Sequence, residues 1–173
     1  MKTKNLFKTI AIAFSLLIGG NMLAQDKNIV ETAIASKDHT TLVAAVKAAN
    51  LVGILSGEEP FTVFAPTNAA FAKLPTGTVD NLLKKENLAT LQGVLTYHVV
   101  AGKFSAKDVI ALIKKGKGKA VIPTVQGGKI SAMIMDGSVY IADENGNKAK
   151  VTAADLDQTN GVIHVIDSVV LPK

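Results

Sequence analysis

The hydrophobic pattern of this 173-residue chain changes near Lys119, from spacing typical of helices to short runs typical of strands. Before that point, apolar residues recur at helical spacing, as in TLVAAVKAANLVGIL. After it come short, β-rich segments separated by turn signals: KAVIPTV, GKISAMIM, SVYIA, KAKVTAADL and GVIHVIDSVVL. Helices gathered in one part of a chain and hairpin-linked strands in another favour an α+β fold with a mostly antiparallel sheet or a sandwich.

Capping residues mark where the expected helices begin. Thr40 or Thr41 is expected to cap the helix that starts with LVAAV. Thr67 or Asn68 is expected to cap the short helix AAFAKL, which follows the strand PFTVFAP. The segment SAKD, which opens with Ser105, resembles a capping box before VIALI. These signals place most of the helices in the first half of the chain.

Turn signals in the second half predict hairpins. The dipeptide Asp136-Gly137 lies between SAMIM and SVYIA and is a strong signal for a two-residue hairpin turn. The segment ENGN predicts the next turn, and the dipeptide Asn160-Gly161 precedes the last strand. Earlier in the chain, the β-branched content of residues 97–100 predicts that the pair Tyr97 and His98 begins a strand.

The first 24 residues have the order of a secretory signal. Three lysines in MKTKNLFK precede the apolar segment TIAIAFSLLIGG, and Ala24 offers a small residue at a cleavage point. The apolar segment is short for a membrane span, which takes about 20 apolar residues. We therefore expect cleavage between Ala24 and Gln25, with an uncleaved anchor as the alternative. The remaining residues, 25–173, are expected to form one domain.

Composition excludes several kinds of chemistry. The chain contains no cysteine, which rules out disulfides, thiol catalysis, iron–sulfur clusters and Cys-rich zinc sites. It also contains no arginine, the usual bidentate contact to phosphates and base edges. Three of the 19 basic residues and none of the 14 acids fall in residues 1–24, so the net charge of +5 falls to +2 without them. We therefore expect no nucleic-acid partner.

No motif indicates catalysis, metal binding or nucleotide binding. The chain has no G-x-S-x-G elbow, no P-loop and no G-x-G-x-x-G segment after a strand. The three histidines, His39, His98 and His164, form no H-x-x-x-H pair. The loop DENGN resembles the start of a calcium loop, but Lys148 stands where the glycine is required. We therefore expect a non-catalytic protein that needs no metal and no cofactor.

The lysine-rich stretch IKKGKGK, residues 113–119, follows an expected helix. A solvated loop is the favoured interpretation, because lysines are favourable near a helix C-terminus and no aromatic residue is interleaved. A contact for an acidic polysaccharide or another anionic surface is the alternative.

Polar residues interrupt two apolar runs, LTYHVV and GVIHVIDSVV. A buried histidine needs a hydrogen-bond partner, so His98 and His164 are expected to be satisfied core residues. The candidate partners of His98 come from the earlier strand and cap: Thr62, Thr67 and Asn68. Because side chains alternate along a strand, Tyr97 and His98 are expected to face opposite sides. Tyr97 is then the better candidate for partner contact, and direct contact by His98 is the alternative.

Three stretches resemble the fasciclin domain in this order: FTVFAPTNAAFAKLP, LTYHVVAGKFSAKDV and TNGVIHVIDSVVLP. The similarity covers about residues 34–172. The motifs include residues that the resemblance marks as structural: Thr62, Thr67, Asn68, Asn160, Gly161, His164 and Asp167. The resemblance implies a fasciclin-like β-sandwich or wedge of about seven strands, with several helices packed at one side.

The resemblance also implies a function. It indicates a secreted or cell-envelope module for adhesion or interaction, without a cofactor, whose partner is a protein or polysaccharide of the cell surface or matrix. In animal relatives, the segment that matches Tyr97 and His98 is associated with integrin recognition, which makes these two residues candidates for partner binding. An envelope binding protein for a polysaccharide or a small apolar ligand is the alternative. We expect an exported protein in the periplasm, at the cell surface or outside the cell, with no membrane span after cleavage.

Overall fold

The structure, a computed structural model, describes residues 27–173. The expected signal at residues 1–24 and its cleavage site lie outside the described residues. The helices are α1 Ile29–Ala35, η1 Lys37–His39, α2 Thr40–Ala48, α3 Val52–Leu55, α4 Asn68–Ala72, α5 Thr78–Leu82, η2 Lys85–Asn87, α6 Leu88–Tyr97 and α7 Ala106–Lys115. The strands are β1 Phe61–Pro66, β2 Val99–Ala101, β3 Lys119–Pro123, β4 Lys129–Met135, β5 Ser138–Ala142, β6 Lys148–Gln158 and β7 Gly161–Ile166.

The seven strands form one mixed sheet in the order β2-β1-β7-β6-β5-β4-β3. Every neighbouring pair is antiparallel except β1 and β7, which run parallel. The sheet curls until the chain beyond β3 reaches β2, where the Val125 amide donates to the Val99 carbonyl at 2.8 Å. The expected number of strands and the mostly antiparallel pairing are confirmed. Because the strands form a single, nearly barrel-like sheet, the expected sandwich or wedge is not confirmed.

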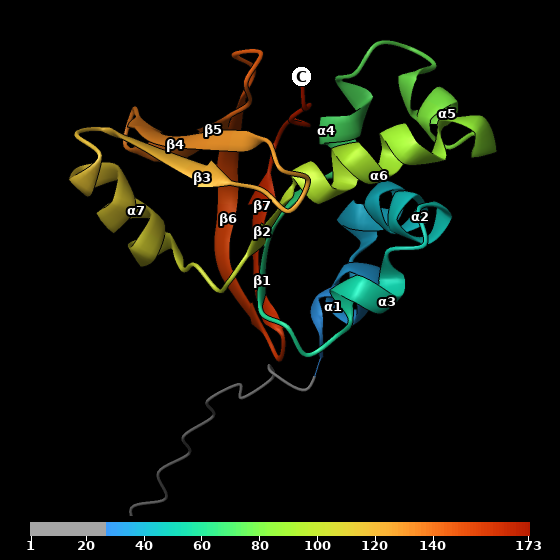
Figure 1. Cartoon of the computed structure of the whole chain (residues 1–173), viewed down its shortest axis with the longest axis horizontal. Coiled ribbons are helices and arrows are strands. Elements are labelled where there is room, and N and C mark those ends of the chain that lie inside the picture. Colours follow the sequence, from blue (N-terminus) through green and yellow to red (C-terminus); the bar gives the residue numbers. More distant parts are fainter. Residues whose placement is uncertain (1–26) are drawn as a thin grey trace, which may run out of the picture.

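Two apolar clusters lie on opposite faces of the central strands. Helices α1 to α6 gather on one side of the sheet, whereas α7 lies alone on the other side (Figure 1). Val63 of β1 belongs to the cluster under the first group of helices, and the next residue, Phe64, belongs to the cluster under α7. All six residues of β1 and of β7 are buried. In the sequence these strands are therefore mostly apolar runs, each interrupted by one polar residue, Thr62 or His164, and not alternating ones.

Several local signals produce the expected structure. Asp136 and Gly137 have φ angles of 49° and 73°, which a type I′ hairpin turn between β4 and β5 requires. Ser105 and Asp108 form the expected capping box at the start of α7. Thr67 caps α4 as expected, because its hydroxyl accepts a hydrogen bond from the Ala70 amide at 3.2 Å.

The expectation that Tyr97 and His98 begin a strand is wrong. Helix α6 continues through Tyr97, His98 is its C-cap, and β2 begins only at Val99. The helix continues because Tyr97 lies three residues after buried Val94 and extends the same buried face. The β-branched residues that suggested a strand are those of β2 itself.

Candidate functional site

The side chain of Tyr97 is fully buried, with an exposed fraction of 0%. Its hydroxyl donates to the Lys129 carbonyl of β4 at 2.6 Å and accepts from the Glu144 amide of the β5–β6 turn at 3.2 Å. Tyr97, the expected contact residue, is therefore not available at the surface, because the end of α6 turns its ring into the sheet. Tyr97 thus joins the start of β4 to the β5–β6 turn from inside.

His98 is also buried, and both of its ring nitrogens have backbone partners. Nδ1 lies 2.8 Å from the Val94 carbonyl, and Nε2 lies 3.2 Å from the Val170 amide. A carbonyl only accepts and an amide only donates, so the ring is neutral and carries its proton on Nδ1. Burial lowers the pKa of His98 to about 4. The expected partners of His98 at Thr62, Thr67 and Asn68 are wrong; the ring instead joins α6 to the C-terminal segment.

The other two histidines lie apart from this pair. His164 Nε2 donates to the Phe104 carbonyl at 2.8 Å, and Nδ1 accepts from the Asp155 amide at 3.3 Å. The Nδ1 atom of His39 lies 2.8 Å from the Ser36 hydroxyl, and burial lowers the pKa of His39. Within residues 27–173, no three His, Asp or Glu side chains gather in a way that would hold a metal ion.

Two residues of the first motif, Thr62 and Asn68, form hydrogen bonds with segments that are distant in the sequence. The Thr62 hydroxyl donates to the Gly102 carbonyl at 2.7 Å and accepts from the Phe104 amide at 2.8 Å. The Asn68 side-chain oxygen accepts from the Thr41 amide at 3.0 Å. Asn68 therefore caps α2 from outside that helix. The expectation that Thr40 or Thr41 caps α2 is wrong, because the N-cap position is His39, which has no side-chain capping bond.

Residues of the closing motif join the two ends of β7 to helices α1 and α3 and to strands β1 and β6. The Asn160 side-chain oxygen accepts from the Ile29 amide at 3.0 Å, and its nitrogen donates to the Leu55 carbonyl at 2.8 Å. Gly161 is required by close approach, because a Cβ there would lie 2.0 Å from the Phe61 carbonyl oxygen. The Asp167 carboxylate accepts from the Lys150 amide at 2.9 Å.

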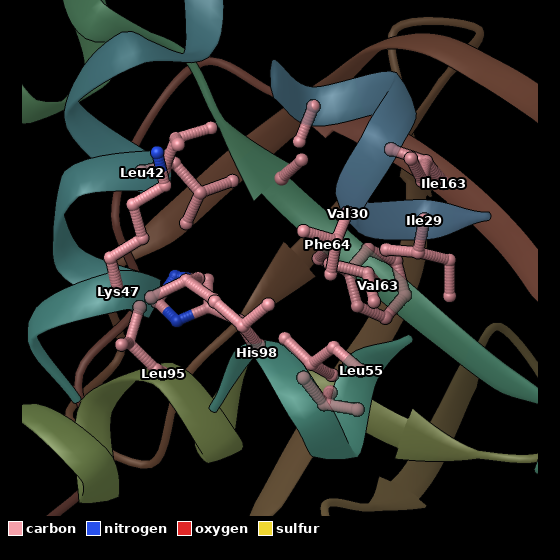
Figure 2. Close-up of a pocket in the computed structure, with 16 residues that line it drawn as sticks. Ile29, Val30, Leu42, Lys47, Leu55, Val63, Phe64, Leu95, His98 and Ile163 are labelled. Carbon is pink, nitrogen blue, oxygen red and sulfur yellow. The ribbon is translucent and has the colours of Figure 1, made fainter. Parts of the chain in front are cut away.

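An apolar pocket lies between α1, α2, α3 and the sheet (Figure 2). Val63 and Ala65 of β1, which belong to the cluster under α1 to α6, form part of its floor, and His98 also lines it. Lys47 of α2 is the only charged residue in the lining. The other lining residues, apart from His98, are aliphatic or aromatic.

The outer face of strands β3 to β6 is solvent-exposed and carries lysines around an apolar centre. Across the strands, Lys119 pairs with Met133, Met133 with Tyr140, and Tyr140 with Lys150. Val121 of the edge strand, 58% exposed, lies on the same face. Strands β3, β4 and β5 contain no acidic residue. We call this surface the lysine face and define it by these residues: Lys119, Val121, Lys129, Met133, Tyr140, Lys148 and Lys150.

The model of the Fasciclin domain matches residues 37–172. The chain belongs to the fasciclin domain family. It is 51% identical over 144 residues to Protein sll1483 of Synechocystis sp., and the matched region covers 83% of this chain and 73% of that protein. It is 36% identical over 123 residues to Cell surface glycolipoprotein MPB83 of Mycobacterium bovis, and the matched region covers 71% of this chain and 48% of that protein.

A solved structure shows the same fold. The FAS1 domain pair of the insect cell adhesion molecule Fasciclin I superposes with a TM-score of 0.73 at 19% identity, covering 84% of this chain and 51% of that chain. The resemblance drawn from the three sequence motifs is therefore confirmed. Within residues 27–173 of this fasciclin domain, no helix has the length and apolar content needed to cross a membrane.

Sequence reasoning missed one residue that organises the fasciclin domain. The buried Asp143 carboxylate accepts from the amides of Asn145 and Asn147 at 3.0 and 2.8 Å, and from the Leu171 amide at 3.0 Å. The turn at DENGN was predicted as a polar hairpin turn, but its link to the C-terminal segment was not. The local signal for this role is an aspartate directly after the apolar strand SVYIA, followed by asparagines two and four residues later. Aspartate in such a position accepts hydrogen bonds from the backbone of a turn.

Proposed function

We propose that this fasciclin domain is an exported, non-catalytic interaction module of the adhesion or matrix class, and that it binds an anionic protein or polysaccharide through the lysine face. The lysine face is the observation that carries the proposal. Exposed apolar and aromatic side chains surrounded by one sign of charge are typical of a surface that binds a partner. The named relatives support the class, because one is a cell-surface protein and the structural neighbour is a cell adhesion molecule.

The lysine face has the chemistry for such a partner. None of Lys119, Lys129, Lys148 and Lys150 forms an ion pair with another residue of the described chain. Their charges therefore remain available to carboxylates or sulfates of a partner. Tyr140 lies among them with its ring partly exposed, and a tyrosine ring can pack on a sugar or an apolar side chain while its hydroxyl stays in water.

Tyr97 and His98 have a supporting role in this proposal. Tyr97 holds the first residue of β4, Lys129, whose side chain belongs to the lysine face. His98 holds the C-terminal segment through Val170. The pair therefore acts on partner binding by keeping the strands of the lysine face in place, and not by direct contact.

Charge reversal tests the proposal. The double variant Lys119→Glu/Lys129→Glu should lose most binding to envelope and matrix fractions and to acidic glycans on an array. The matched control is Lys84→Glu/Lys85→Glu, which makes the same change of charge at exposed positions between α5 and α6. Binding of the unaltered protein should weaken with added salt, since exposed charges are screened. Equal binding by both double variants would place the contact surface elsewhere and contradict the proposal.

A further inference from the structure

The apolar pocket under α1 (Figure 2) shares no residue with the lysine face and has its own chemistry. Its volume is about 40 Å³. Only Lys47 and His98 contribute polar side chains to its lining. His98 offers no free hydrogen-bonding group to a ligand, because both ring nitrogens already have backbone partners. Whatever enters the pocket must therefore be apolar.

The mouth of the pocket differs from its floor. Val63, Ala65 and Leu95 on the floor are buried, whereas Ala33 and Val43 at the mouth are partly exposed. Lys47 is exposed and lines the same mouth, and it forms no ion pair with any residue of 27–173. A lysine can lay its carbon stem on apolar surface while its ammonium stays in water. The site thus joins an apolar interior to a single positive charge at its entrance.

We propose that this pocket binds the alkyl end of an unbranched carboxylate, and that Lys47 pairs with the carboxylate at the mouth. The volume limits how much of the ligand enters: about 40 Å³ is far below the roughly 150 Å³ of a cavity that accepts benzene, so only the terminal carbons of an alkyl chain lie inside. A slender alkyl chain fits where an aromatic ring does not. The lone charge selects the head group, because Lys47 attracts an anion and repels a cation.

Titration with a series of linear carboxylates, from acetate through hexanoate to decanoate, tests the apolar part of the proposal. Binding is measured at neutral pH by calorimetry and by NMR shifts of methyl groups in the lining. Each added methylene group should tighten binding about fourfold until the pocket is full, after which affinity should level off. Benzoate should bind far more weakly than hexanoate. Equal binding of acetate and decanoate would overturn the proposal.

Variants of the mouth locate the binding site. Ala33→Leu places a larger side chain in the entrance and should abolish decanoate binding. Val43→Met does the same from α2, so the test survives if the first variant fails to fold. Thermal unfolding without ligand confirms that each variant is folded. Decanoate binding that persists in a folded blocked variant would overturn the proposal.

The head group is tested by changing each partner of the expected ion pair. Lys47→Gln should weaken decanoate binding about two- to fivefold, as expected for a partly exposed pair, and leave decanol binding unchanged. Lys107→Gln on α7 is the matched control and should leave decanoate binding unchanged. In the unaltered protein, decyltrimethylammonium should bind more weakly than decanoate. Equal affinity for decanoate and decyltrimethylammonium would overturn the role of Lys47. None of these results depends on the lysine face, so the two proposals fail independently.

Discussion

At the scale of single residues, the Tyr97–His98 pair joins parts of the fasciclin domain that are distant in the sequence. The Tyr97 hydroxyl lies between the Lys129 carbonyl and the Glu144 amide, and the His98 ring lies between α6 and the Val170 amide. Without the side chains, each of these backbone groups would lose this hydrogen-bond partner, and those held by His98 are buried. We therefore expect the loss of either side chain to lower the free energy of unfolding.

Tyr97→Phe should destabilise the domain by about 1–3 kcal/mol, because it removes the hydroxyl partner of two partly buried backbone groups. Tyr140→Phe is the matched control on the lysine face and should change stability by less than about 0.5 kcal/mol. Urea unfolding of both variants measures the difference. Equal stability of the two variants would show that the Tyr97 hydrogen bonds contribute nothing net.

The buried ring of His98 predicts sensitivity to acid. The folded pKa of about 4 lies below the ordinary value of 6.5, so between these pH values the unfolded chain binds a proton that the folded chain excludes. The contribution of the neutral His98 ring to the free energy of unfolding is therefore fully present above pH 6.5. It decreases as the pH falls, by about 3 kcal/mol on reaching pH 4. His98→Gln should be less stable at pH 7 but lose less stability over this range. Urea midpoints at several pH values give the change of stability with pH for both proteins. The same pH dependence in both would show that His98 is not the source of the acid sensitivity.

At the scale of elements, helix α2 depends on a residue outside it. Its own N-cap residue, His39, makes no side-chain capping bond, and the Asn68 side chain accepts from the Thr41 amide instead. The same Asn68 side chain donates to the Lys37 carbonyl at 3.0 Å. Asn68 thus fixes the start of α2 relative to β1 and α4.

Asn68→Ala should cost about 1–2 kcal/mol, as expected for the loss of a helix cap. Asn87→Ala is a suitable comparison, because the Asn87 side chain bonds only to Asn81, six residues away, near the surface. Its cost should be below about 0.5 kcal/mol. Unfolding in urea measures both, and hydrogen exchange should show the first turn of α2 exchanging faster in Asn68→Ala alone.

Elements with a local signal were predictable from the sequence, and contacts between distant elements were not. The capping box at Ser105 and the hairpin at Asp136-Gly137 involve neighbouring residues, so their patterns are visible in the chain. The cap of α2 joins residues that are 27 positions apart. The burial of His98 followed from its apolar neighbours, but its partners are backbone groups, which carry no sequence signature.

At the scale of the whole molecule, the parallel pair of β1 and β7 connects the two apolar clusters. Side chains of β1 alternate between the cluster under α1 to α6 and the cluster under α7. Phe61 pairs with Gly161 where this parallel pair begins. Close approach of the two backbones at Gly161 is therefore a condition for joining both halves of the fold.

Gly161→Ala should destabilise the domain by roughly 3 kcal/mol or more, since its Cβ would lie 2.0 Å from the Phe61 carbonyl oxygen and force the backbones apart. Gly93→Ala should have the opposite effect on stability. Gly93 lies within α6 with no atom within 4 Å of an added Cβ, so alanine should stabilise the helix by about 0.5–1 kcal/mol. Thermal and urea unfolding compare the two. A stable Gly161→Ala protein would mean that the parallel pair can separate at little cost.

The position of β7 in the sheet has a consequence for how the chain folds. The last strand along the sequence lies at the interior of the sheet, between β1 and β6. Contacts between distant segments form slowly, because closing a long loop costs entropy before any contact is gained. A growing chain therefore cannot complete this sheet until β7 has been synthesised. Until then, β1 and β6 each lack a partner along one edge, and both apolar clusters remain without the side chains that β7 supplies.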